Sequence, residues 1–161
     1  MEIRDLLLVH LKDLEAKGHD CRKCVGLCCT DQFNTMKITL QEAQTIQSYL
    51  ENQDKWNLDL LQKLKQTIVK YRLDLALPGN GKRSYIRRSY TCTFYELEAG
   101  GCQLPRTHRP LGCLAFNPLG PERIGDEGCA QSFPLKDDVD REFLPVAVSK
   151  LFEHSSSNLD A

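Results

Sequence analysis

In the stretch Cys21-Arg-Lys-Cys24-Val-Gly-Leu-Cys28-Cys29 the chain gathers four of its eight cysteines. A Cys-x-x-Cys step lets two thiolates turn toward one metal ion, and soft thiolates select zinc, copper(I) or iron-sulfur clusters over harder cations. The other four, Cys92, Cys102, Cys113 and Cys129, lie in a second stretch far along the chain. A metal would tie the two stretches together, so we predict that all eight cysteines are metal ligands.

Composition and cysteine use indicate a cytoplasmic protein. The chain has 161 residues, 41% of them hydrophobic and 27% charged, which suffices for one domain that buries its own core without disulfides. Residues 1–18 alternate charges with leucines, a pattern that predicts neither a secretory signal nor a membrane span. In a reducing cytoplasm disulfides are disfavoured, so the cysteines point to metal binding or redox chemistry. We expect no membrane partner.

Helical periodicity predicts an α+β fold that is mainly helical, in which helices frame cysteine-bearing loops. Apolar residues recur at three- and four-residue steps from Ile3 and predict a helix that ends near Gly18 and delivers Cys21. A second helix begins with the capping box Thr39-Leu-Gln-Glu42 and runs to about Leu50. The residues predicted to face inward on this helix are Leu40, Ala43, Ile46 and Leu50.

A third helix and a β-hairpin are predicted next. The helical period continues from Leu58 to Leu75, until Pro78-Gly79-Asn80-Gly81 interrupts it. Beyond this breaker the pattern changes to short extended pieces. Thr91–Glu96 and Cys102–Leu104 are predicted to pair as a short β-hairpin around the turn at Ala99-Gly100-Gly101.

The remainder of the chain is predicted to be an irregular loop followed by a helix. Prolines and glycines are frequent from Pro105 to Pro134, so no long regular element is expected around Cys113 and Cys129. A final helix is predicted from Asp138 to about His154, and Pro145 inside it implies a kink or a restart.

The expected domain organisation is simple. No internal repeat, low-complexity tract or second domain is evident in the sequence. We predict one small metal-ordered domain over residues 1–154 and a disordered tail over residues 155–161.

Three other interpretations of the cysteines compete with metal binding. The first is that the cysteines are small residues of the hydrophobic core, but eight of them, including an adjacent pair, make this a poor explanation. A redox-active pair at Cys21 and Cys24 lacks the strand-then-helix context of a thioredoxin-like site. A secreted disulfide scaffold disagrees with the expected compartment. Metal binding is therefore the preferred interpretation.

The combined cysteine pattern also resembles a known family. After the first cluster come Cys92-x-Phe94, Gly101-Cys102, Arg109-Pro110-x-x-Cys113-x-x-Phe116 and Cys129. This combination is similar to the YkgJ-type cysteine-cluster (CxxCxxCC) family, over about residues 20–129. The resemblance implies a zinc- or iron-chelating domain. Flagellin lysine methylase looks similar in its cysteine cluster, so the resemblance also admits an enzyme.

Arg109 is predicted to lie just outside the metal ligands. Zinc held by four thiolates carries a formal charge of about -2, and such a buried charge requires cations or hydrogen-bond donors nearby. Arg109 precedes Cys113 closely in the sequence. The alternative is that Arg109 is an ordinary surface arginine. His108 is the one histidine near the site, but with eight thiols available we predict that it is not a ligand.

The preferred function is a non-catalytic or metal-handling protein that chelates one or two zinc ions. Cys-x-x-Cys arms are common in all-thiolate zinc sites, and the chain lacks the cysteine run of bacterial ferredoxins. It also lacks the nucleophile-elbow, phosphate-loop, zinc-protease and dinucleotide motifs, so we favour a role other than enzyme. The main alternative is an iron-sulfur protein with a redox or modification role, since thiolates bind both metals.

A third interpretation is a zinc-stabilised module that binds nucleic acid or a protein partner. The net charge of -1 gives no overall attraction to nucleic acid. Local cations alternate with Tyr85 and Tyr90, and such patterns can follow a phosphate backbone and stack bases. The cations of this segment are Lys82, Arg83, Arg87 and Arg88. A solvated hairpin, or cations that face the thiols, is the favoured explanation of this segment.

Overall fold

The computed structural model describes residues 2–18, 27–75, 88–99, 101–118, 129–131 and 141–157. These residues form an α+β fold that is mainly helical, as the sequence predicts. The elements in chain order are α1 (Ile3–Ala16), η2 (Leu27–Cys29), β1 (Lys37–Ile38), α2 (Leu40–Asn52), α3 (Leu58–Tyr71), β2 (Tyr95–Glu96), β3 (Gly101–Cys102), η3 (Arg106–His108), α4 (Leu111–Leu114), β4 (Phe116–Pro118), β5 (Cys129–Gln131), β6 (Glu142–Phe143) and α5 (Leu144–Ser157). Within the described ranges no helix is long and apolar enough to cross a membrane.

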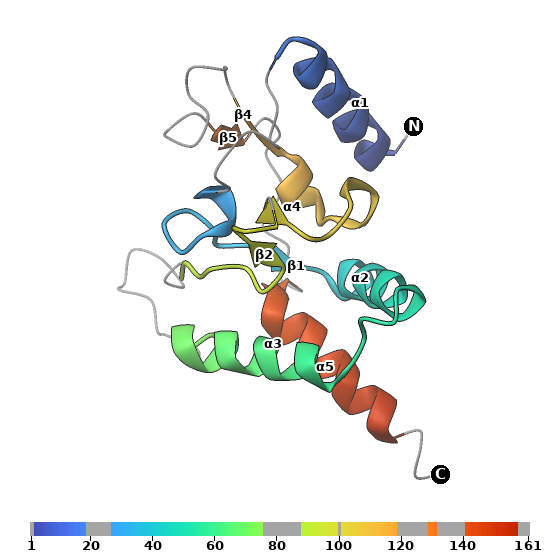
Figure 1. The fold of residues 1–161 in the computed structure, drawn as a ribbon, viewed down its shortest axis with the longest axis vertical. Coiled ribbons are helices and arrows are strands. Elements are labelled where there is room, and N and C mark those ends of the chain that lie inside the picture. The colour runs from blue at the N-terminus through green and yellow to red at the C-terminus, as the bar shows by residue number, and fades with distance from the viewer. Residues whose placement is uncertain are drawn as a thin grey trace.

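The main core lies where α2 and α3 pack against α5 (Figure 1). Ile46 of α2, Leu64 of α3 and Val148 of α5 are all fully buried there. Trp56, in the turn between α2 and α3, stacks on Phe152 with ring centroids 3.7 Å apart. Two consecutive helices and the distant α5 therefore share one apolar interior, whose burial stabilises the fold.

Local signals explain where α2 begins. The Thr39 side chain accepts from the Glu42 N–H, and the Glu42 carboxylate accepts from the Thr39 N–H, which is the predicted capping box. Ala43, Ile46 and Leu50 face the core as predicted. The expectation for Leu40 is wrong: its side chain is 60% exposed, because the first residue of the helix lies at the edge of the core.

The third helix ends earlier than predicted. The Asn57 side chain caps its start by accepting from the Leu60 N–H at 3.0 Å. Arg72 adopts a left-handed conformation with φ 55° and closes the helix there. Leu75 therefore lies beyond α3, and the prediction that the helix reaches it is wrong.

Helix α5 differs from its prediction at both ends. It begins at Leu144, so the expected start at Asp138, which lies outside the described residues, is too early. Pro145 occupies the first turn, where its missing N–H costs nothing, so the helix begins there and the predicted kink or restart is wrong. The expectation of disorder from residue 155 is wrong for 155–157, which continue the helix, while 158–161 lie outside the described residues.

Three antiparallel strand pairs complete the described structure. In the predicted hairpin Tyr95 is paired with Cys102, although both strands are shorter than expected. The sequence did not predict that β1 pairs with β6 or that β4 pairs with β5. The latter pair lies within the stretch from Pro105 to Pro134 that is predicted to be irregular. Backbone hydrogen bonds therefore join two parts of this stretch, Phe116–Pro118 and Cys129–Gln131.

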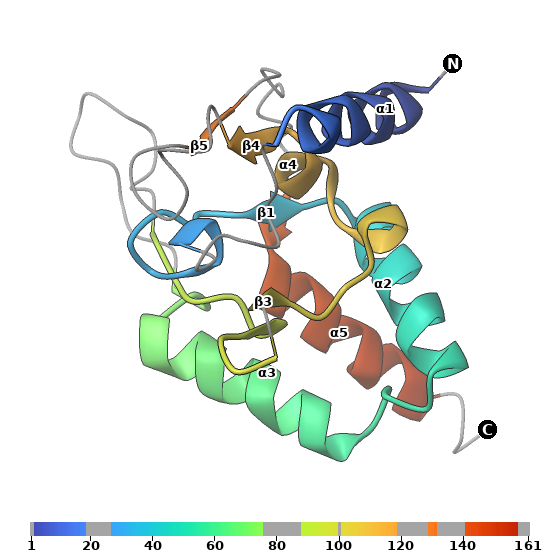
Figure 2. The same cartoon turned by 45° about the horizontal axis from the view of Figure 1, so that its top comes forward.

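A second, smaller apolar cluster holds α1. Leu7 and Leu11 pack against Leu114 and Ala115, at and just after the end of α4. Both views place α1 beside α4 and on the opposite side of the molecule from α3 (Figures 1 and 2). Helix α1 therefore covers the segment that carries Cys113.

The core assignment predicts a sharp contrast within α2. Leu50 is 4% exposed and Leu40 is 60% exposed on the same helix. Leu50→Ala should lower the free energy of unfolding by about 2–5 kcal/mol, because it leaves a cavity in the core. Leu40→Ala should change it by no more than about 0.5 kcal/mol. Urea denaturation of the two variants measures both values, and equal losses would contradict the assigned core.

Candidate metal centre

The two cysteine-bearing stretches lie side by side. Cys28 and Cys29 form the end of the short helix η2. The Cys29 carbonyl accepts a hydrogen bond of 2.7 Å from the backbone N–H of Cys92. Next to it, the Asp31 N–H donates to the Thr91 hydroxyl at 3.2 Å. Backbone contacts thus join the first cluster to the start of the second.

A buried tyrosine fixes this junction. The Tyr90 N–H donates to the Asn34 carbonyl at 2.9 Å, and the Asn34 amide donates to the Tyr90 carbonyl at 2.9 Å. The Tyr90 hydroxyl donates to the Met36 carbonyl at 2.6 Å, and the whole side chain is fully buried. Because these bonds satisfy polar groups inside the protein, they hold residues 29–36 against residues 90–92.

Cys102 is positioned by the hairpin. It lies opposite Tyr95, and the next N–H, that of Gln103, donates to the Phe94 carbonyl at 2.8 Å. The Cys102 thiol lies 3.8 Å from the Leu104 carbonyl. Cys92 and Cys102 are both half-buried and pack against the main core. The hairpin therefore positions Cys102, and both cysteines contact the main core.

Cys113 is positioned by a contact that the sequence did not reveal. It lies in α4, whose first N–H, that of Leu111, donates to the Glu42 carboxylate at 2.8 Å. The other oxygen of this carboxylate accepts from Thr39 at 2.9 Å. Glu42 is only 9% exposed. The carboxylate that caps α2 therefore also anchors α4, and with it Cys113.

The thiols influence one another electrostatically. Burial raises the pKa of the Cys113 thiol well above its usual value, and the charges of Cys92, Cys102 and Cys28 raise it further. Burial raises the pKa of Cys92 to about 12, with further contributions from Cys102 and Cys28. A hydrogen bond with Cys29, then burial, raises the pKa of Cys28. The charges of Cys28 and Cys102 therefore act on both Cys92 and Cys113.

Arg109 lies beside this group of thiols. Its charge lowers the pKa of Cys28 and of Cys113, against the larger effect of burial. Its Nε donates to the Leu104 carbonyl at 2.8 Å, which fixes the side chain next to the hairpin. The Arg109 carbonyl in turn accepts from the Arg4 guanidinium of α1 at 2.7 Å. Arg109 is therefore a cation whose charge acts on both Cys28 and Cys113.

The donor set suits a soft metal without completing a site. In the part of the chain that the structure describes, no three His, Cys, Asp or Glu side chains form a group that could hold a metal ion. Cys21, Cys24 and the side chain of Cys129 lie outside it, and the five other cysteines carry free thiols. Raised thiol pKa values oppose a reactive, redox-active cysteine. They are compatible with ligands that lose their protons to a metal.

The other predicted residues lie in different environments. His108 packs on the Tyr49 ring with centroids 4.7 Å apart, and its Nδ1 contacts the Thr107 hydroxyl at 2.9 Å. These contacts belong to the packing of η3 on α2. Arg106 forms an ion pair with Glu15 of α1.

The predicted basic segment is only partly described. Lys82, Arg83, Tyr85 and Arg87 lie outside the described residues. Arg88 is half-buried and donates to the Leu75 carbonyl. The expectation that Tyr90 can stack on a base is wrong, because its ring is fully buried.

Comparisons with protein-family models, with curated proteins and with solved structures found no match to this chain. The resemblance to the YkgJ-type family therefore stays a prediction.

The double role of Glu42 can be tested by mutation. Glu42→Ala removes the acceptor for two N–H groups and should lower the free energy of unfolding by about 2–3 kcal/mol. It should also speed alkylation of Cys113 in chelator-treated protein, because α4 loses its anchor. The control is Glu51→Ala, an exposed glutamate of the same helix whose carboxylate accepts from the Gln47 side chain at 2.9 Å. Equal effects of the two substitutions on both measurements would contradict the role of Glu42.

The raised pKa of Cys92 predicts a pH dependence of stability in metal-free protein. In the unfolded chain this thiol loses its proton near pH 9, whereas in the folded chain its pKa is about 12. Above pH 9 the unfolded state therefore binds fewer protons, and stability falls as pH rises, by up to about 1.4 kcal/mol per pH unit per thiol. Below pH 8 this contribution is constant.

Urea denaturation at pH 7, 8, 9 and 10 in chelator measures this slope. Cys92→Val removes the titrating group and should reduce the fall above pH 9, whereas any packing cost of the substitution is the same at every pH. An unchanged slope in Cys92→Val would contradict the assigned cause.

Proposed function

We propose that this protein binds zinc through clustered cysteine thiolates and that the bound metal orders its cysteine-bearing segments. The observation that supports the proposal is the hydrogen bond from the Cys92 N–H to the Cys29 carbonyl, which places one cysteine of the first cluster against one of the second. Cys102 and Cys113 lie within electrostatic reach of Cys92. Free thiols from separate segments are the usual donors of a structural zinc site, and the five cysteines whose side chains are described all carry free thiols.

The proposed ligands are Cys21, Cys24, Cys28, Cys29, Cys92, Cys102, Cys113 and Cys129. Eight thiolates suffice for two tetrahedral sites, and four for one. Arg109 would offset the negative charge of the metal and its thiolates, since it lies close to Cys28 and Cys113. The bound zinc would cross-link the cysteine-bearing segments and so stabilise the fold. We propose a binding or metal-handling role for the protein instead of catalysis.

An iron-sulfur cluster is the alternative occupant, because the same thiols suit it. Buried sulfur ligands next to an arginine are compatible with either metal. Zinc is preferred because the chain lacks a ferredoxin-type cysteine run. The two occupants differ in visible absorption, since zinc thiolates are colourless and iron-sulfur clusters are brown.

Substitution of one ligand tests the proposal. Cys113→Ser should lower bound zinc per chain and the melting temperature together, because site formation and folding are linked. Thr107→Ser is the control: it is an equally small change, at an exposed position in the neighbouring η3, and should leave both values unchanged. Metal content is measured by elemental analysis and melting by circular dichroism. If Cys113→Ser retains full zinc and the wild-type melting temperature, Cys113 is not a ligand.

A further inference from the structure

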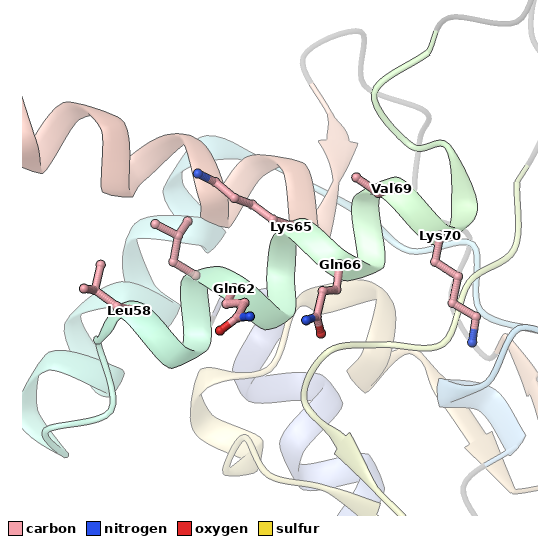
Figure 3. A pocket seen from close by; sticks show the side chains of 7 residues that line it. Leu58, Gln62, Lys65, Gln66, Val69 and Lys70 are labelled. Atoms are coloured by element: carbon pink, nitrogen blue, oxygen red, sulfur yellow. The ribbon is translucent and has the colours of Figure 1, made fainter.

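Helix α3 presents a shallow groove along its solvent side (Figure 3). Its buried side carries Leu64, which is fully buried, and packs against α5. Its outer side carries Leu58 and Val69, which are 78% and 69% exposed. Two large apolar side chains are thus displayed three helical turns apart, with Gln62 and Gln66 between them.

Charges lie at the two ends of this surface. Asp59 is in the first turn of α3 and Lys70 is in its last turn. Both charges complement the helix dipole, which alone explains their presence. The spacing of these two charges also matches the spacing of the two exposed apolar residues. Asp59 and Lys70 are separated by the same number of residues as Leu58 and Val69, so at about 100° per residue each pair differs by only about 20° around the helix.

This arrangement is self-complementary when a second copy is placed antiparallel. A two-fold axis at the level of Leu64 brings Gln62 opposite Gln66 of the second copy, and these amides can hydrogen-bond. The same axis brings Leu58 to within one residue, about 1.5 Å along the helix, of Val69, and brings Asp59 equally close to the oppositely charged Lys70. Because the axis is two-fold, each of these contacts occurs twice.

We propose that two copies of this protein associate through the outer faces of α3, antiparallel, in the register that pairs Leu58 with Val69 and Asp59 with Lys70. One helix face buries less area than a standard interface, so the dimer is weak and reversible. Lys65 borders the groove, where its aliphatic stem can cover apolar surface while its ammonium group stays in water. This surface lies away from the proposed thiol site, and association does not require the metal.

Sedimentation velocity of the full chain, from micromolar to millimolar concentration, tests the proposal. Wild-type protein should show a monomer–dimer equilibrium. Val69→Asp should abolish the dimer over this range, because it places a carboxylate in the apolar contact. The matched control is Val9→Asp on α1, where a valine is 53% exposed on a different surface, and this variant should dimerise as wild type does.

Charge exchange tests the register. Asp59→Lys alone and Lys70→Asp alone should each weaken the dimer by about tenfold, since each places like charges opposite one another twice. The double variant Asp59→Lys with Lys70→Asp should restore it. A wild-type protein that stays monomeric at all concentrations would overturn the proposal. So would a dimer unaffected by Val69→Asp, or a double variant as weak as the single ones.

Discussion

The fully buried pairing of Asn34 with Tyr90 is the interaction on which the arrangement of the cysteine segments depends. Two hydrogen bonds of 2.9 Å join these residues, and a third, of 2.6 Å, fixes the Tyr90 hydroxyl on Met36. Inside a core such polar groups are costly to leave unpaired, so the two segments are held in one register. That register places Cys29 against Cys92.

Other contacts hold the segment that carries Cys113. Glu42 ties α4 to the start of α2, and Arg4 ties α1 to the carbonyl of Arg109. Without a metal, the thiols of this region keep their protons, because burial and mutual repulsion oppose thiolates there. A bound zinc would reverse that preference by replacing the protons. The proposed metal and the fold therefore stabilise one another.

The sequence predicted what is local and missed what is distant. The start of α2 follows from a capping box of four residues, and the hairpin at Cys102 follows from strand-forming residues around a glycine turn. The contact of Glu42 with Leu111 joins residues far apart in sequence, and no pattern announces it. Strands β1 and β6 have two residues each, too few to show alternation. The expectation that the thiols converge on a metal rests on ligand chemistry alone and stays a prediction, since the structure shows only that Cys29 lies against Cys92.

The most direct test of the account is the metal content of wild-type protein purified without oxygen, measured by elemental analysis together with its visible absorption spectrum. The account predicts colourless protein with one or two zinc ions per chain, retained through gel filtration. Folded protein without stoichiometric metal would contradict it. Brown protein that contains iron and sulfide would show that the site holds an iron-sulfur cluster and not zinc.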